Sequence, residues 1–362
     1  MNHPGAPMKV GLLGAGNVSP LYLPNLLPAP GIEVAAISDL NRDLATARAA
    51  EFGISTVLTP DELIDHPDIE LVLNFTPIPA HAETTRCVLA AGKHVYSEKP
   101  LATSAAEALS LVEEAERRHL RLGCAPDTLL GSGLQTARAT LEGGAVGRPL
   151  GAGAFMFRRA APSAAYATEA FAFRDMAAYY VTTLVTLFGP ARRVVGLQET
   201  LNAAQAAASF QETPISFGGV LEFDGRLLVT LLLAWGTDHR SEVASFHVYG
   251  TRGDLTVPNP NVFGEAASVR LYSEPSAQVV EGSVQPPDWP RQQRGLGVAE
   301  MAEAIREERQ PRAAGDLAAH VVEVIEGIIA AAQQGDPVDL HTGFVLPPPL
   351  EAAERARLLG RG

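Results

Sequence analysis

The fold is decided by Lys9-Val10-Gly11-Leu12-Leu13-Gly14-Ala15-Gly16-Asn17-Val18-Ser19, an apolar run that leads into a glycine turn. The run is typical of a buried β-strand, and a helical pattern of leucines follows the turn. Gly14 permits a tight turn, and Gly16 lets the backbone approach a pyrophosphate on the helix N-terminus. Ser19 replaces the third glycine of this fingerprint, and glycine turns also occur for purely structural reasons. The residues predicted to bind a dinucleotide here are Gly14, Gly16, Asn17 and Val18.

A second apolar run, residues 33–38, ends in Asp39, which stands 23 residues after Gly16. A carboxylate at this place accepts hydrogen bonds from the adenosine ribose and repels a 2′-phosphate, so NAD is the favoured cofactor. Arg42 is close enough to bind that phosphate instead, which leaves NADP open. We therefore predict that Asp39 and Arg42 meet the adenosine end of the cofactor.

Strand-like and helix-like segments continue to alternate, which predicts a doubly wound parallel sheet. Further strands are expected at residues 71–75, 94–97 and 120–124, and a capping box at Thr59 to Glu62 predicts a helix start. Cofactors bind at the carboxyl ends of the strands in such sheets. The residues that follow two of these ends, and are therefore predicted to contact cofactor, are Thr76, Pro77, Glu98, Lys99 and Pro100. His81, early in the next helix, is added as a contact at the cofactor edge.

Lys99 is unusual because only Lys9 and Lys93 are also lysines, whereas every other cationic side chain is arginine. The pKa of a lysine falls readily on burial, so a lysine can exchange protons near neutral pH and an arginine cannot. The functional hypothesis is a proton-transferring lysine at the cofactor edge. The alternative is a solvated lysine that pairs with Glu98.

Composition excludes several classes of function. The chain has 362 residues and a formal net charge of −13, which argues against binding to nucleic acid or to an anionic membrane. No signal peptide, membrane span or metal-ligand spacing is evident. Cys87 and Cys124 lie in apolar surroundings and are interpreted as reduced core residues. We expect a cytoplasmic protein without a bound metal.

Together these residues resemble the glucose-fructose oxidoreductase and inositol dehydrogenase family, Gfo/Idh/MocA. The strongest part of the resemblance is Ala91-Gly92-Lys93-His94-Val95-Tyr96-Ser97-Glu98-Lys99-Pro100-Leu101, after the Gly11 to Gly16 turn and the Asn74 to Pro77 strand end. The resemblance implies a Rossmann domain followed by an α+β domain, whose open antiparallel sheet often forms an oligomer interface. It also implies hydride transfer between nicotinamide and a sugar, polyol or related alcohol. A homodimer or homotetramer built through that sheet is expected.

The pattern changes after about Arg148, where strand-like runs follow one another without long helices between them. Such a series predicts a mainly antiparallel sheet. The runs expected to form strands are residues 150–157, 193–198, 218–223, 226–235, 242–249 and 269–272. We expect a Rossmann domain over residues 1–128 and an α+β substrate and oligomerisation domain over residues 129–362, with C-terminal helices that pack on either domain.

One helix in the second domain carries Asp175 and Tyr179 four residues apart, hence on one face. The family resemblance implies an Asp, a glycine two residues later, and a His or Tyr four residues after the Asp. The chain matches the Asp and the Tyr but has Ala177 instead of the glycine. We predict that Lys99 and Tyr179 bond the reacting oxygen and that Asp175 orients them. A core tyrosine bonded to Asp175 is the alternative.

The residues before Asp175 are rich in alanine and offer few groups that could hold a sugar. Either the substrate is smaller or less polar than a typical hexose, or its hydroxyl contacts come from elsewhere. The candidates for substrate contacts are Lys99, Asp127, Thr128, Arg158, Trp235, His239 and Arg294. The predicted activity is an NAD(P)-dependent dehydrogenase that acts on a carbohydrate-like secondary alcohol. The competing hypothesis is a regulatory or sensor protein that binds the cofactor without turnover.

Overall fold

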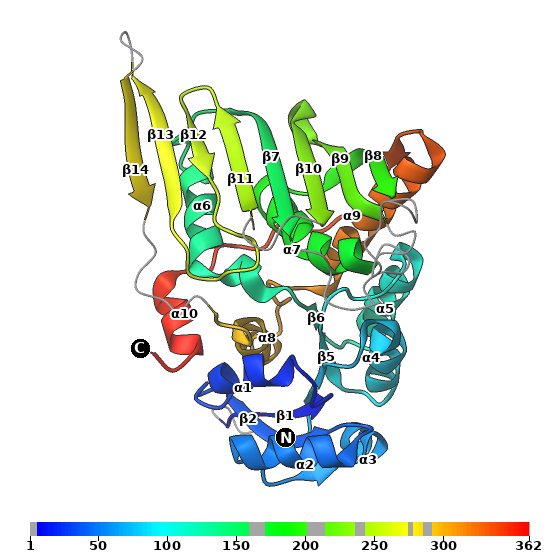
Figure 1. Cartoon of the computed structure of the whole chain (residues 1–362). Coiled ribbons are helices and arrows are strands. Elements are labelled where there is room, and N and C mark those ends of the chain that lie inside the picture. The colour runs from blue at the N-terminus through cyan, green and yellow to red at the C-terminus, as the bar shows by residue number, and fades with distance from the viewer. Residues whose placement is uncertain are drawn as a thin grey trace. The chain divides into compact units, whose positions relative to one another are not determined.

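The structure, a computed structural model, describes residues 6–158, 171–200, 214–235, 243–273, 278–284 and 292–361. The chain divides into two compact units (Figure 1). The first comprises Met1–Leu130, Gln292–Val322 and Pro347–Gly362, and the second comprises Gly131–Arg291 and Glu323–Leu346. Each unit is described by itself. The boundary expected after residue 128 stays a prediction of domain organisation.

The first unit contains a six-stranded parallel sheet in the order β3-β2-β1-β4-β5-β6. Its N-terminal elements are β1 (Met8–Leu13), α1 (Ser19–Leu26), β2 (Ile32–Ser38), α2 (Arg42–Phe52), β3 (Val57–Leu58), α3 (Pro60–Asp65), β4 (Leu71–Asn74), η1 (Ile78–Ala80), α4 (His81–Ala90), β5 (His94–Ser97), α5 (Ala105–Arg117), β6 (Leu122–Cys124) and η2 (Asp127–Leu130). Later segments add α8 (Leu296–Arg306), the start of α9 (Gly315–Gln334) and α10 (Ala352–Leu358). This order is that of a doubly wound Rossmann sheet, as the sequence predicts.

Local sequence explains where the helices of the first unit begin. Asn41 caps α2 by accepting from two backbone amides, and Gly53 ends that helix in the left-handed conformation. The predicted capping box of Thr59 and Glu62 is present at α3. At α5, Ser104 accepts from the Glu107 amide. Side-chain caps thus fix the first residues of these three helices.

The second unit contains a nine-stranded sheet in the order β14-β13-β12-β11-β7-β10-β9-β8-β15. Its elements are α6 (Ser132–Glu142), β7 (Pro149–Arg158), α7 (Phe171–Phe188), β8 (Ala191–Thr200), β9 (Pro214–Phe223), η4 (Asp224–Arg226), β10 (Leu228–Trp235), β11 (Val243–Gly250), β12 (Gly253–Thr256), β13 (Ala267–Ser273), β14 (Gln278–Val284) and β15 (Val338–Asp339). Neighbouring strands run antiparallel, apart from β7 and β10, which are parallel. The predicted mainly antiparallel sheet is confirmed.

Two expectations for the second unit need correction. The helix predicted around Asp175 and Tyr179 is present, but as α7 it runs over 18 residues between β7 and β8, where the sequence predicts strands without long helices between them. Its mostly apolar composition hides how far the helix extends. The strands β12 and β14 have no counterpart among the predicted strands.

Among the described residues, helices pack on one face of the nine-stranded sheet, which we call the covered face; we call the opposite face the open face (Figure 1). On the covered face, Gly196 and Gly219 let the sheet approach Ile328 of α9 closely, and Phe173 of α7 stacks on Phe217. On the open face Leu197 keeps 80% of its surface exposed. Further open-face residues with large exposed surfaces are Val195, Leu228 and Tyr249. Such apolar exposure is unusual for a sheet that contacts only water.

Candidate active site

The glycine turn after β1 is built for close backbone approach. Gly14 has φ +108°, and a Cβ atom there would lie 2.4 Å from the Phe75 carbonyl oxygen. A side chain is therefore excluded at Gly14 on two grounds. Beside Gly16, by contrast, a Cβ atom would meet nothing within 4 Å. The Ser19 hydroxyl, at the place of the third glycine, donates to the Gly16 carbonyl at 2.9 Å. The turn is thus held by the hydrogen bond between Ser19 and Gly16, and the space beside Gly16 can take a ligand.

Asp39 connects the end of β2 to this turn. Its Oδ2 accepts from the Ala15 amide at 2.8 Å, and its Oδ1 accepts from the Asn41 amide at 2.8 Å. Both bonds hold the carboxylate in place, and each oxygen keeps a second lone pair for a ligand hydroxyl. Arg42 is exposed in the first turn of α2.

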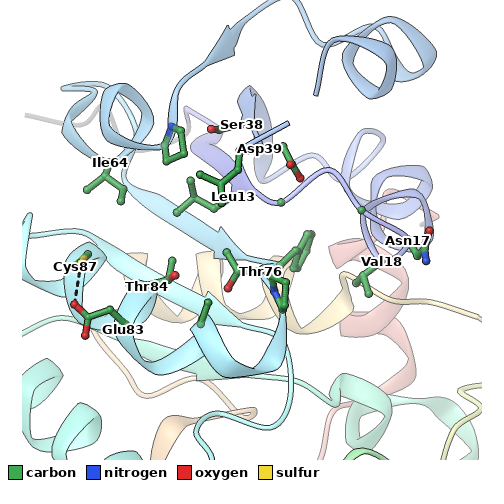
Figure 2. Close-up of a pocket in the computed structure, with 17 residues that line it drawn as sticks. Leu13, Asn17, Val18, Ser38, Asp39, Ile64, Thr76, Glu83, Thr84 and Cys87 are labelled. Carbon is green, nitrogen blue, oxygen red and sulfur yellow. Dashed lines mark hydrogen bonds between the residues drawn. The ribbon is translucent and has the colours of Figure 1, made fainter. Parts of the chain in front are cut away.

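A cavity of about 540 Å³ lies at the carboxyl edge of the six-stranded sheet (Figure 2). Its mostly apolar lining includes Gly14, Gly16, Asn17, Val18, Asp39, Leu40, Ile64, Thr76 and Pro77. Asn17 and Val18 lie at one end of it, and Glu83 and Cys87 lie at the other (Figure 2). Seven predicted cofactor residues therefore share one cavity, whereas Arg42, His81, Glu98, Lys99 and Pro100 are outside its lining.

The cavity fits the adenosine and phosphate part of a dinucleotide. Its size is typical of a small-molecule site, and its walls are apolar where an adenine base would pack. Backbone amides of the turn at residues 17–19, which leads into α1, lie next to the open space beside Gly16 and can bind phosphate oxygens. Pro20 has no amide hydrogen, and the Leu21 amide donates to the Val18 carbonyl at 2.9 Å. Asp39 supplies the carboxylate for a ribose diol. The residues present thus suit a nicotinamide dinucleotide.

Asn74 joins the two loops that follow β4 and β5. Its side-chain Oδ1 accepts from the Thr76 hydroxyl at 2.7 Å, and its backbone carbonyl accepts from the Glu98 amide at 2.9 Å. Asn74 is also paired in register with Ser97. Lys99, two residues beyond Ser97, therefore follows the strand next to the one that leads into the cavity wall. Its side chain is buried.

Glu98 is held inside the first unit by Tyr22. The Tyr22 hydroxyl donates to Glu98 Oε1 at 2.6 Å, and the Lys99 amide donates to Oε2 at 3.1 Å. Burial and the charge of Glu98 raise the pKa of Tyr22 well above its usual value, so this hydroxyl stays protonated. The Glu98 carboxylate thus accepts hydrogen bonds from the Tyr22 hydroxyl and from the Lys99 backbone amide.

Asp127 is fully buried and caps α8. Its Oδ2 accepts from the amides of Gly295 at 2.9 Å and Gly297 at 3.0 Å. Burial raises its pKa from 3.8 to about 6. Thr128 and Arg294 are buried as well. The predicted substrate roles of Asp127, Thr128 and Arg294 stay predictions, and the structure adds a structural role for Asp127.

In the second unit, Asp175 and Tyr179 lie on α7, and Tyr179 is buried. Arg158, at the end of β7, donates to the sulfur of Met176 at 3.5 Å and is paired in register with Trp235. The structure thus brings Arg158 and Trp235 together next to α7. His239 and the alanine-rich segment at 159–170 lie outside the described residues.

Two family models cover most of the chain. Residues 8–125 match the model described as "Oxidoreductase family, NAD-binding Rossmann fold", and residues 134–256 match the Gfo/Idh/MocA C-terminal domain. The chain belongs to the Gfo/Idh/MocA family. The predicted NAD-binding Rossmann domain and oxidoreductase class are thereby confirmed.

Curated relatives within the Gfo/Idh/MocA family are dehydrogenases and reductases. The chain is 26% identical over 348 residues to a dTDP-3,4-didehydro-2,6-dideoxy-alpha-D-glucose 3-reductase from Streptomyces violaceoruber, with 90% of this chain and 95% of that protein covered. It is 25% identical over 349 residues to a 1,5-anhydro-D-fructose reductase from Ensifer adhaerens, with 92% and 99% covered. The named relatives give no support to a non-catalytic role.

Solved Gfo/Idh/MocA structures share the fold. A levoglucosan dehydrogenase in complex with NADH and levoglucosan superposes with a TM-score of 0.80 at 19% identity, over 92% of this chain and 99% of that one. An aldose-aldose oxidoreductase from Caulobacter crescentus gives the same TM-score and identity, over 92% and 100%. Within the described residues, no helix is both long and apolar enough to cross a membrane.

Three site features of this family member were missed from sequence. Tyr22 and Asn74 both hold Glu98, which is distant from each of them in sequence, so no local pattern marks these contacts. Cys87, expected in the core, is exposed and lines the cavity, whereas Cys124 is buried as expected. The position of Cys87 on the outer face of α4 explains the error, because its neighbours in sequence are apolar and its neighbours in space include Glu83.

Proposed function

We propose that this Gfo/Idh/MocA member transfers hydride between a nicotinamide cofactor and a secondary alcohol or ketone of a sugar or polyol. One observation carries the proposal. Lys99 is buried at the end of β5, next to the strand that leads into the wall of the cavity formed by Gly14, Asp39 and Thr76. A buried lysine after this strand supports the proposal, because cofactors bind at the carboxyl edge of such sheets.

NAD is the preferred cofactor in this proposal. Asp39 lines the cavity and would accept hydrogen bonds from the adenosine ribose, whereas Arg42 is absent from the lining. The carboxylate would also repel the 2′-phosphate of NADP. Phosphate oxygens would bind the amides of the turn at residues 17–19, beside Gly16, where α1 begins.

The nicotinamide ring, when bound, would accept hydride from the alcohol or donate hydride to the ketone. Lys99 would hold the substrate oxygen by a hydrogen bond and exchange its proton with that oxygen. Glu98 and Pro100 fix the backbone on either side of Lys99 through their own partners. The assignments of Tyr179 as a second hydrogen-bonding group and of Asp175 as its orienting partner stay predictions from sequence.

The proposal is tested by a search for NADH formation and consumption. A panel of myo-inositol, other cyclitols, aldoses, 1,5-anhydro-D-fructose and keto sugars should contain at least one compound that changes NADH absorbance in a chain-dependent way. The names of the relatives motivate this panel. Tight NADH binding without turnover on any member would instead favour the sensor hypothesis.

We further propose that the open face of the nine-stranded sheet forms a homodimer or homotetramer interface. The exposed apolar residues Leu197, Leu228 and Tyr249 support this assignment, because exposed apolar surface on one face of a sheet favours association. Replacing Leu197 by Asp should shift the elution volume toward the monomer. An unchanged elution volume would contradict the interface. A cytoplasmic location is proposed as well.

A further inference from the structure

His81 lies between two backbone carbonyls that belong to different loops of the first unit. Its Nδ1 is 2.7 Å from the Pro100 carbonyl oxygen, and its Nε2 is 2.8 Å from the Thr76 carbonyl oxygen. The side chain is 1% exposed, so water does not compete for these contacts. A neutral ring donates to one carbonyl, and a protonated ring donates to both. The imidazole is thus a cross-link between the loop after β4 and the segment after β5.

The His81 backbone is fixed as firmly as its ring. Asn74 donates through Nδ2 to the His81 carbonyl at 2.9 Å and to the Thr85 hydroxyl at 3.1 Å. The same Asn74 side chain holds Thr76, and the Asn74 carbonyl holds the Glu98 amide. Because Asn74 holds the His81 backbone in place, a displacement of the Thr76 carbonyl moves the His81 ring and through it the Pro100 carbonyl.

The two loops have different tasks in the proposed function. Thr76 and Pro77 line the cofactor cavity, whereas Pro100 directly follows Lys99 and lies outside the lining. Tyr22 already holds the other side of Lys99 through Glu98. His81 joins the Pro100 side of Lys99 to the Thr76 carbonyl in the cavity wall, beside the links that Asn74 and Tyr22 make to Glu98. Such a link matters because a small misplacement of a catalytic group lowers the rate strongly.

We propose that His81 is a positioning residue that couples occupation of the cofactor cavity to the placement of Lys99. The inference rests on the proposed function for its kinetic consequence, but the coupling itself concerns two backbone segments and can be measured without turnover. The charged groups that act on the ring are Glu98 and Lys99, and their effects on its pKa oppose each other. Burial is the largest influence and lowers that pKa.

The test replaces His81 by Phe, which keeps a ring and removes both nitrogens. The matched control is His94→Phe, because His94 begins β5 at the opposite end of the strand from Lys99 and bonds the Arg121 amide instead. Amide hydrogen exchange is measured with and without NADH in residues 76–82 and 98–102. We expect NADH to slow exchange in both segments of the wild type and of H94F. In H81F it should slow exchange in residues 76–82 only.

Kinetics add a second readout on a substrate found in the panel. H81F should lower kcat by about tenfold to a hundredfold and change its pH profile, with a smaller effect on NADH affinity. If H81F does not fold, His81→Asn is measured in the same way, since the shorter amide cannot span both carbonyls. Equal NADH protection of both segments in these variants would overturn the inference. An active Lys99→Met variant would overturn the proposed function and leave the exchange result valid.

Discussion

The Tyr22 hydroxyl donates to the Glu98 carboxylate at 2.6 Å, although 76 residues separate the two in sequence. Tyr22 lies on α1, directly behind the glycine turn, and Glu98 precedes Lys99. Phe75, whose carbonyl defines the space at Gly14, packs its ring against Tyr22 with centroids 4.5 Å apart. One tyrosine therefore contacts both the cavity wall and the scaffold of Lys99.

Replacing Tyr22 by Phe should destabilise the protein. The substitution leaves Glu98 Oε1 buried without its donor, and loss of a hydrogen bond to a buried charged group costs about 1–3 kcal/mol. Urea unfolding measures the free-energy change. The matched control is Tyr96→Phe, because the Tyr96 hydroxyl is buried and has no hydrogen-bond partner in the described part of the chain. The control should change stability by less than about 1 kcal/mol, and equal losses in both variants would refute the role of the Tyr22–Glu98 bond.

Asp39 should decide the choice of cofactor. Asp39→Ala removes the ribose acceptor and the negative charge, so NADH affinity should fall by about tenfold to a hundredfold while NADPH affinity changes less or rises. Fluorescence titration with each reduced cofactor measures both affinities. Asp43→Ala, which removes an exposed acid in the first turn of α2, serves as the control and should leave the NADH-to-NADPH ratio unchanged. If the Asp39 variant keeps the wild-type ratio of NADH to NADPH affinity, the assignment of Asp39 to the ribose is contradicted.

Asp127 should make stability depend on pH in an unusual direction. Its pKa is raised from 3.8 to about 6, so the folded state binds the proton more tightly than the unfolded state. Asp127 therefore destabilises the folded protein least below about pH 4, where it is protonated in both states. The free energy of unfolding falls as the pH rises from about 4 toward and through 6. Relative to Asp127→Asn, which does not titrate, the wild type should lose up to about 3 kcal/mol between about pH 4 and pH 7. Urea unfolding over this range measures the difference, and a difference independent of pH would refute the prediction.

Local and periodic features of the fold could be predicted from sequence. The strands of the first unit are short apolar runs between polar loops, and the Thr59–Glu62 capping box marks a helix start, so both are visible along the chain. The carboxyl edge of the sheet follows from topology alone, and this is why Gly14, Asp39 and Thr76 were expected on one side. The cavity they share requires no information beyond the strand order.

Long-range features could not be predicted in this way. The bond from Tyr22 to Glu98 and the cap that Asp127 provides for α8 join segments 76 and about 170 residues apart, and no spacing encodes them. The sequence left open whether the C-terminal helices pack on the first domain or extend the second, because their apolar residues would suit either unit, and Gln292–Val322 belongs to the first. The helix around Asp175 and Tyr179 was predicted, but the 18-residue length of α7 was not, because a mostly apolar segment shows only a weak helical period.

The most direct test of the account is the effect of Lys99→Met on turnover and on NADH affinity, measured on a substrate from the sugar and polyol panel. Lys99→Arg is measured beside it, because arginine keeps the charge and cannot exchange a proton. Lys9→Met is the control, since Lys9 forms only a surface ion pair with Asp68. We predict that both Lys99 variants bind NADH within about threefold of wild type and lose about 10²–10⁴ in kcat, with Lys9→Met unchanged. A Lys99→Met variant that folds, binds NADH and retains the parental kcat would contradict the central claim.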